Sequence, residues 1–208
     1  MDDKNKKAVE IYNQIAEEYS KNYDSIDDED DLIFLNSFLS YLKPKSYIVD
    51  VGCGTGFSAG YFVKKGMEAE GSDLSSNMIA IAKRNYPKIK FNLADMRSFK
   101  PKKKADAVWA GYSMFHFDKN DFDKTIENIK TYLKFNGIFG LVMQEGEGEV
   151  EVPEPFIPGK TIYLRLYTEK ELVSILKSHG FKILGRKRKI AKHPNEFSYN
   201  KLLLIVTM

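Results

Sequence analysis

The sequence predicts an α/β fold with a doubly wound, mostly parallel sheet of seven strands whose last strand is antiparallel. Two observations lead to this prediction. From residue 47 to residue 143, short apolar runs alternate with amphipathic helical stretches, which is typical of βαβ units and of a parallel sheet covered on both faces. The last two apolar runs are separated by only about ten residues, a connection that joins antiparallel but not parallel strands.

The expected elements follow one another in a regular order. The right-handed sense of crossovers between parallel strands restricts their arrangement to a doubly wound sheet. The expected strands are residues 47–51, 68–72, 89–92, 105–110, 138–143, 181–189 and 201–207. The expected helices are residues 6–19, 32–42, 57–65, 75–85, 119–133 and 168–180.

Local signals set the ends of several elements. The second helix is expected to end before Pro44, because the residue ahead of a proline disfavours helical backbone. The last helix begins with a capping box, Thr168 and Glu171, and ends at Gly180. Between elements, the acidic residues 24–31 are expected to form a loop or a helix start, and residues 134–137 a turn.

Length and composition indicate one globular domain over residues 1–208. Hydrophobic residues make up 43% of the chain and charged residues 29%, which is a globular rather than a disordered composition. The net charge of +3 does not indicate a dedicated nucleic-acid binder. The basic runs 100–104 and 186–192 are therefore expected to be solvated surfaces.

The location is predicted from cysteine usage and from apolar segments. Cys53 is the only cysteine, so an intrachain disulfide is excluded and a reducing, cytoplasmic environment is expected. The first residues are charged and lack the apolar core of a signal peptide. No segment approaches the roughly 20 apolar residues that span a bilayer, so we expect no membrane association.

A glycine-rich loop follows the first expected strand. It reads Gly52-Cys53-Gly54-Thr55-Gly56 and stands just after Asp50. Glycine adopts positive φ without strain and lets a ligand approach the backbone. Ligands of open α/β sheets bind outside the carboxyl ends of the strands, where this loop is expected to lie. The loop therefore predicts a bound cofactor.

The spacing of the glycines excludes two kinds of cofactor site. The chain has no phosphate-binding G-x-x-x-x-G-K-[ST] motif. A dinucleotide site would require G-x-G-x-x-G, but Phe57 occupies the position of the third glycine, which disfavours a nicotinamide enzyme. The carboxylate of Asp50 repels a pyrophosphate and favours a cation, such as an ammonium or a sulfonium.

Residues 49–56, VDVGCGTG, resemble the first motif of class I S-adenosylmethionine-dependent methyltransferases, on their Rossmann-like fold. Further stretches resemble other parts of the family in the same order. The first resembles its N-terminal helix, and the last resembles a late helix that is common in its small-molecule and lipid-like branches. These stretches are IYNQIAEEYS (11–20), ADM (94–96), DAVWAGYSMFHF (106–117), LKFNGIFGLV (133–142) and YTEKELVSILKSHGF (167–181). The chain departs from the family at residues 134–137, where a proline and two glycines are usual, and it lacks the Asn-Pro-Pro-Tyr signature of base methylation.

The resemblance implies a set of cofactor contacts. Asp73 would take the ribose hydroxyls, Asp95 the adenine amine, and Cys53 only a backbone contact. Asp73 alternatively caps the helix that follows it, Asp95 is alternatively a surface acid, and Met78 alternatively belongs to the core. The implied contacts with S-adenosylmethionine are Tyr12, Tyr19, Asp50, Gly52, Cys53, Gly54, Gly56, Asp73, Leu74, Met78, Asp95, Met96, Ala110 and Gly111.

The implied reaction is an in-line transfer of a methyl group that leaves S-adenosylhomocysteine as the product. Such a reaction needs orientation and a dry pocket, and no metal. A base is needed only for an acceptor that arrives protonated. The candidates, in order, are His116, Tyr112 and Glu145, and His116 is alternatively a packed histidine without a catalytic role.

The implied acceptor is a small molecule. The protein itself is expected to be a monomer or a homodimer. Residues 1–42 would cover the cofactor, and residues 144–167 would act as a substrate lid, since residues 144–160 are rich in Gly, Pro and Glu. Phe156, Tyr163 and Tyr167 would give the acceptor site an aromatic wall. Two alternatives remain: an RNA or protein methyltransferase that docks through its basic runs, and a non-catalytic module that only binds the cofactor.

Overall fold

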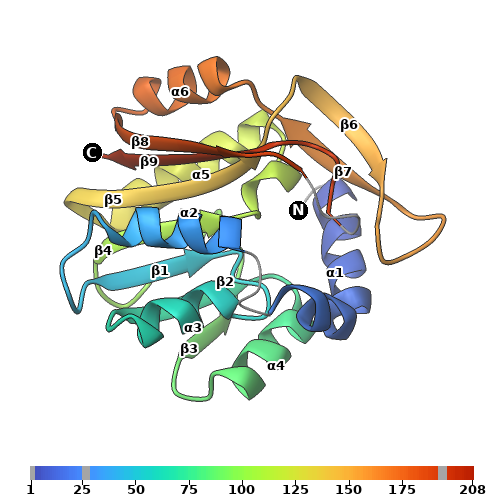
Figure 1. Cartoon of the computed structure of the whole chain (residues 1–208), viewed down its shortest axis with the longest axis horizontal. Coiled ribbons are helices and arrows are strands. Elements are labelled where there is room, and N and C mark those ends of the chain that lie inside the picture. Colours follow the sequence, from blue (N-terminus) through green and yellow to red (C-terminus); the bar gives the residue numbers. More distant parts are fainter. Residues whose placement is uncertain (1–2, 25–28, 192–195) are drawn as a thin grey trace.

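Seven strands form the central sheet of the computed structural model, which describes residues 3–24, 29–191 and 196–208. They are β1 (Tyr47–Val51), β2 (Glu68–Asp73), β3 (Lys90–Leu93), β4 (Ala105–Gly111), β5 (Leu133–Gln144), β8 (Lys182–Lys189) and β9 (Lys201–Thr207). Their order is β3-β2-β1-β4-β5-β9-β8 (Figure 1). Strands β1 to β5 pair in parallel, and β9 runs antiparallel to β5 and β8. The predicted fold class is confirmed.

Helices cover both faces of this sheet. They are α1 (Asp3–Tyr23), α2 (Glu29–Leu39), α3 (Phe57–Lys64), α4 (Ser76–Asn85), α5 (Lys119–Tyr132) and α6 (Glu169–Ser178), with a short 3-10 helix η1 (Met114–His116) after β4. Apolar residues of α2 and α3 share one core cluster, and those of α5 and α6 share another. Among the described residues, no helix combines the length and apolar character that crossing a membrane requires.

The strands supply both core clusters because successive side chains point to opposite faces of a sheet. In β4, Ala107 and Trp109 pack toward α2 and α3, whereas Val108 and Ala110 pack toward α5 and α6. A strand buried on both faces reads as a continuous apolar run, which is how β1 and β4 appear in the sequence.

Residues 144–160 differ from the loop that the sequence predicted. They contain β6 (Gly148–Pro153), which pairs antiparallel with β7 (Thr161–Leu166) in a separate two-stranded sheet. This hairpin lies beside α1 (Figure 1), and Lys4 and Lys7 of α1 each reach a glutamate of β6, Glu149 and Glu151, at 3.0 Å. Glutamates that face outward alternate with half-buried valines along β6, the usual pattern of a strand with one packed face.

Residues 134–137 do not form the expected turn. Strand β5 begins at Leu133, directly after α5. Its register against β4 shifts near this end, because Leu133 pairs with Ala105 whereas Ile138 pairs with Ala107, so β5 has extra residues between the two pairs. The extra residues are accommodated by Asn136, whose φ of 59° lies in the left-handed region. The acidic stretch 24–31 is only partly described: α2 begins at Glu29, and residues 25–28 lie outside the described part of the chain.

The bulge at Asn136 gives a test of this backbone geometry. Asparagine and glycine tolerate left-handed φ, whereas a β-carbon without a compensating side chain costs about 1 kcal/mol there. We expect Asn136→Ala to lower the free energy of unfolding by about that amount, and Asn136→Gly to leave it unchanged or raise it. Urea denaturation of the three proteins measures both effects. Equal destabilisation by both substitutions would contradict this explanation, because glycine removes the strain.

Candidate active site

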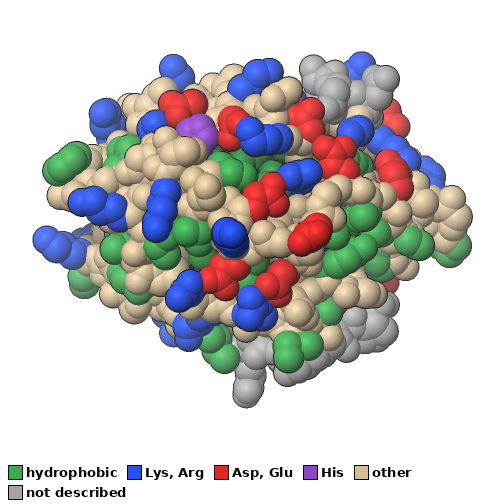
Figure 2. Space-filling model, turned by 90° about the horizontal axis from the view of Figure 1, so that it is seen from above, with side chains coloured by type: hydrophobic (Ala, Val, Ile, Leu, Met, Phe, Trp, Pro, Cys, Tyr) green, Lys and Arg blue, Asp and Glu red, His purple; other side chains and the backbone are tan. Residues whose placement is uncertain are grey.

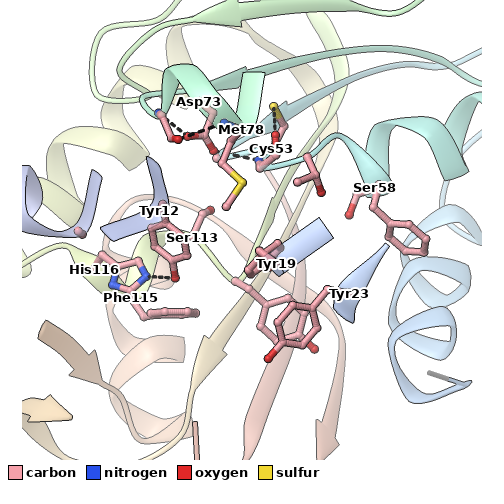
Figure 3. A pocket seen from close by; sticks show the side chains of 18 of the residues that line it. Tyr12, Tyr19, Tyr23, Cys53, Ser58, Asp73, Met78, Ser113, Phe115 and His116 are labelled. Atoms are coloured by element: carbon pink, nitrogen blue, oxygen red, sulfur yellow. Dashed lines mark hydrogen bonds between the residues drawn. The ribbon is translucent and has the colours of Figure 1, made fainter. Parts of the chain in front are cut away.

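A cavity of about 600 Å³ opens at the carboxyl ends of the central strands, the position at which open α/β sheets bind ligands. Its wall combines the glycine loop with parts of α1, α2 and η1 (Figure 3). Most of the predicted site residues line this cavity: Tyr12, Tyr19, Asp50, Gly52, Cys53, Gly54, Asp73, Leu74, Met78, Met96, Gly111, Tyr112 and His116. Three predicted cofactor contacts do not: Gly56, Asp95 and Ala110.

The glycine loop has the backbone that the sequence predicted. Gly52, Gly54 and Gly56 have φ values of 69°, 51° and 85°. A β-carbon on Gly52 would meet that of Ser113 at 2.3 Å, but one on Gly54 would meet nothing within 4 Å. Gly52 is therefore required by packing, whereas the open space over Gly54 leaves its backbone accessible to a ligand. Gly56 caps α3 and contributes to the turn rather than to the cavity wall.

Asp73 holds the loop in place. One carboxylate oxygen accepts a hydrogen bond from the Gly54 amide at 2.9 Å, and the other accepts from the Ser75 amide at 2.8 Å. Ser75 in turn caps α4 by accepting from the Met78 amide. The carboxylate thus joins the loop after β1 to the start of α4, while Asp73 also lines the cavity. The cap of α4 is therefore Ser75 and not Asp73, and the position of Asp73 leaves a ligand contact open.

Asp50 is a buried carboxylate without a full set of partners. Its side chain is 98% shielded from solvent (2% exposed), and none of the described residues donates to Oδ2. Burial, together with the charge of Asp73, raises the pKa of Asp50 to about 8, although the Ala59 amide donates to it. A cationic group beside Oδ2 would favour the ionised form. The site therefore suits an ammonium or a sulfonium.

Asp95 lies outside the cavity wall because a neighbour holds it. Both of its carboxylate oxygens accept hydrogen bonds from Arg97, at 2.6 to 3.0 Å, and Arg97 also pairs with Asp121. The guanidinium lowers the pKa of Asp95 despite its partial burial. Its neighbours Ala94 and Met96 line the cavity in its place. Ala110 is buried within β4 and is likewise absent from the wall.

His116 uses both ring nitrogens. Its Nδ1 lies 3.0 Å from the Tyr163 carbonyl oxygen, and its Nε2 lies 2.8 Å from the Tyr12 hydroxyl (Figure 3). A carbonyl only accepts, so Nδ1 carries the proton and Nε2 accepts from Tyr12. Burial lowers the pKa of His116 to about 4, which keeps the ring neutral near pH 7. This arrangement favours a positioned, neutral histidine.

The other two candidate bases differ in placement. Tyr112 lines the cavity, and its φ of 57° lies in the left-handed region. This backbone conformation costs energy for a tyrosine, and residues that adopt it are found most often at functional sites. Glu145 does not line it: Arg188 binds both of its carboxylate oxygens, at 2.7 and 2.8 Å. The candidate role of Glu145 as a base is therefore not supported by its position.

The aromatic wall differs from the predicted one. Phe156 lines the cavity, but Tyr163 and Tyr167 do not. Aromatic residues that the sequence analysis did not assign to the site are Tyr23, Phe34, Phe57, Trp109, Phe115, Phe117 and Phe197. Two cationic residues were also missed, Lys189 and Lys201. A lysine at the head of the apolar run 201–206 was a signal for Lys201, since an inward-facing strand position seldom carries a charge.

Comparisons with known proteins agree with this geometry. Residues 48–137 match a family described as a methyltransferase domain. The trans-aconitate 2-methyltransferase of Enterobacter sp. (strain 638) is 30% identical over 110 residues, which cover 52% of this chain and 43% of that protein. The chain spans less than half the length of the curated relatives that it matches.

Two of the solved structures that resemble this chain show how far the likeness extends. A SAM-dependent methyltransferase from Methanosarcina mazei superposes with a TM-score of 0.73 at 20% identity, over 81% of this chain and 94% of that one. The Burkholderia thailandensis 1,6-didemethyltoxoflavin-N1-methyltransferase, with 1,6-didemethyltoxoflavin and S-adenosylhomocysteine bound, gives 0.73 at 16% identity, over 100% and 91%. At these identities the superpositions establish the fold. The resemblance is thus confirmed: residues 48–137 match the methyltransferase-domain family, and the chain has the fold of the class I S-adenosylmethionine-dependent methyltransferases.

Proposed function

We propose that this protein transfers a methyl group from S-adenosylmethionine to a small-molecule acceptor. The observation that carries the proposal is the pairing of Asp50 with the open backbone of Gly54 in one cavity. Asp50 offers a buried carboxylate oxygen to a cation, and Gly54 leaves room for a ligand to approach the loop. Both belong to the segment that matches the methyltransferase family.

The residues present fit this cofactor. Asp50 would hold the ammonium of its amino-acid end, and the remaining lone pairs of Asp73 would accept from the ribose hydroxyls. Met78 and Met96 would flank the adenine, with Tyr12 and Tyr19 on the side of α1. When bound, the cofactor supplies an activated methyl group on its sulfonium. The work of the chain is then to orient the acceptor and to exclude water.

Within this proposal, His116 positions Tyr12. A ring whose pKa lies near 4 is a weak base, and its Nε2 already accepts a hydrogen bond from the Tyr12 hydroxyl. The Tyr163 carbonyl fixes the tautomer, so the hydroxyl of Tyr12 is held at one point of the cavity wall. An acceptor that arrives with a free lone pair then needs no base. For an acceptor that arrives protonated, Tyr112 remains the candidate base.

A small acceptor is favoured over a macromolecule by the surface. Lys103, Arg186 and Arg188, from the two basic runs, pair with glutamates, and acidic and basic side chains are interspersed on the face in Figure 2. The acceptor would enter beneath α1 and the segment 144–167, of which Gln144, Glu154, Pro155 and Phe156 line the cavity. The proposal also includes a cytoplasmic location and a monomeric or homodimeric protein. The free, buried thiol of Cys53 is consistent with a reducing location.

The cofactor is tested by isothermal titration calorimetry with S-adenosylmethionine and, separately, with NAD. We expect the wild type to bind S-adenosylmethionine and not NAD, and Asp73→Ala to weaken binding by about tenfold or more, because charged hydrogen-bond partners are lost. Asp95→Ala is the matched control and should bind nearly as tightly as the wild type. Absence of S-adenosylmethionine binding by a folded sample would overturn the proposed function. Equal losses in both variants would restore Asp95 to the site.

The raised pKa of Asp50 predicts that cofactor affinity rises with pH. Below its pKa of about 8, the carboxyl is protonated in the free protein and must ionise to bind a cation. The dissociation constant should therefore fall by up to about tenfold per pH unit between about pH 5.5 and pH 7, where an α-ammonium keeps its proton. Calorimetry on Asp50→Asn should show weaker and nearly pH-independent binding. The same slope in this variant would assign the pH dependence to another group.

The lowered pKa of His116 predicts a loss of stability in acid. Its ordinary value of about 6.5 applies to the unfolded chain, so between about pH 6.5 and pH 4 the unfolded state binds a proton that the folded state excludes. The stability conferred by the neutral ring is complete above this window and is lost as pH falls through it. Relative to His116→Gln, the wild type should lose about 3 kcal/mol of unfolding free energy between pH 7 and pH 4. Parallel stability curves in denaturant titrations would contradict the buried neutral assignment.

A further inference from the structure

Glu154 places a buried carboxylate in the wall of the cavity. It follows β6 directly, in the connection to β7, and it is 5% exposed. Its Oε1 accepts a hydrogen bond from the Phe156 amide at 3.2 Å. Among the described residues, no group donates to Oε2, and no lysine or arginine pairs with the carboxylate. Glu154 therefore faces the cavity with one backbone hydrogen bond and no counter-charge.

A carboxylate in this position is costly without a cation. Glutamate is almost never fully buried unless it is paired, because removal from water penalises its charged form. Burial accordingly raises the pKa of Glu154, and the amide hydrogen bond offsets only part of this effect. A cation that entered the cavity would pair with the carboxylate and favour its ionised form. The position is thus one that a positively charged ligand would complete.

Acids outnumber lysines in the cavity wall. Five acids and two lysines among the described lining residues leave three formal negative charges. Bound S-adenosylmethionine, which carries an ammonium, a sulfonium and a carboxylate, would offset one of these charges. The wall therefore favours a further cation over an anion. The residues counted are Asp24, Asp50, Asp73, Glu154 and Glu196, with Lys189 and Lys201.

The other four acids of the wall have partners or a proposed ligand. Glu196 pairs with a lysine of β9 at 2.8 Å, and Asp24 accepts hydrogen bonds from two hydroxyls. Asp73 binds the amides of the glycine loop and of the start of α4. Asp50 is proposed to hold the ammonium of the cofactor. Of the described side chains none engages Glu154, which leaves this carboxylate for a different ligand.

Four aromatic rings, which we call the aromatic row, lead along the cavity to Glu154. The ring centroids of Tyr12 and Tyr19 are 6.1 Å apart, and those of Tyr19 and Tyr23 are 4.6 Å apart. Phe156 follows Tyr23 at 5.8 Å, and its amide binds Glu154. All four residues line the cavity, and Figure 3 shows Tyr19 and Tyr23 side by side. The faces of such rings attract cations, so the row and the carboxylate favour the same ligand.

We propose that Glu154 binds the ammonium of an amine-bearing acceptor, with the aromatic row packed against the rest of that molecule. This assignment rests on the proposed function and narrows its acceptor to a small cationic molecule. The carboxylate supplies the counter-charge and the open hydrogen-bond acceptor Oε2, and the rings exclude water from the pair. Tyr12 lies within electrostatic reach of both Glu154 and Asp73, so the row joins this subsite to the proposed cofactor subsite.

Three related compounds test the charge that the cavity prefers. Phenethylamine carries an ammonium at neutral pH, 2-phenylethanol replaces it with a neutral hydroxyl, and 3-phenylpropionate carries a carboxylate. They are titrated by calorimetry into the protein saturated with S-adenosylhomocysteine, which lacks the sulfonium charge that would repel a cation. Phenethylamine should bind at least about tenfold more tightly than 2-phenylethanol, because its hydrogen bond to Glu154 is charge-assisted. The carboxylate of 3-phenylpropionate is repelled by Glu154, so this compound should bind most weakly.

Variants locate the effect. Glu154→Gln keeps the shape of the side chain and removes its charge, so it should abolish the preference for phenethylamine over 2-phenylethanol and leave the affinity for S-adenosylhomocysteine unchanged. Glu147→Gln is the matched control and should keep the preference, since it removes the same charge from an exposed position outside the cavity wall. If Glu154→Gln fails to fold, Glu154→Asp, which should keep the preference, and the wild-type comparison decide.

The outcomes separate the two proposals. Equal binding of phenethylamine and 2-phenylethanol, or binding of none of the three compounds, would overturn the assignment of Glu154 and leave the proposed function intact. A preference that survives Glu154→Gln would assign the cation to another acid. Loss of S-adenosylhomocysteine binding in a folded Glu154→Gln variant would place Glu154 in the cofactor subsite and likewise overturn the assignment. A folded wild type that does not bind S-adenosylhomocysteine would overturn the proposed function, and the amine subsite with it.

Discussion

The carboxylate of Asp73 is the constraint on which the candidate site depends. Its two oxygens bind the amides of Gly54 and Ser75, which belong to a loop and a helix that follow different strands. The loop has three left-handed glycines and little side-chain packing of its own, so these hydrogen bonds fix its path. Because the loop also carries the open backbone of Gly54, one carboxylate both shapes the cavity and faces into it. Buried charge-assisted hydrogen bonds of this kind are strong and directional.

The fold and the glycine loop were predictable because their signals are local. Alternating strands and helices, and glycines at every second position, require no knowledge of distant contacts. The surroundings of Asp95 were not predictable for the opposite reason: its carboxylate is bound by Arg97, which also pairs with Asp121 of α5 in a distant part of the chain. Likewise, the composition of residues 144–160 indicated a loop, although the alternation of glutamate and valine from Glu149 to Val152 was the better signal for a strand. The pairing of His116 with Tyr12 joins residues 104 positions apart and could not be read from spacing.

The hydrogen bonds of His116 also tie together three elements that the chain keeps far apart. Tyr12 belongs to α1, His116 to η1, and the Tyr163 carbonyl to β7, while two surface ion pairs join α1 to β6. Any displacement of α1 away from the sheet must therefore carry the hairpin along or break a buried hydrogen bond. The two kinds of tether respond differently to the solvent, because salt screens the exposed ion pairs and leaves the buried contact intact. At high salt, α1 would still be held by its uncharged contacts, among them the hydrogen bond of Tyr12 with His116 and those of Asn13 with the start of α4.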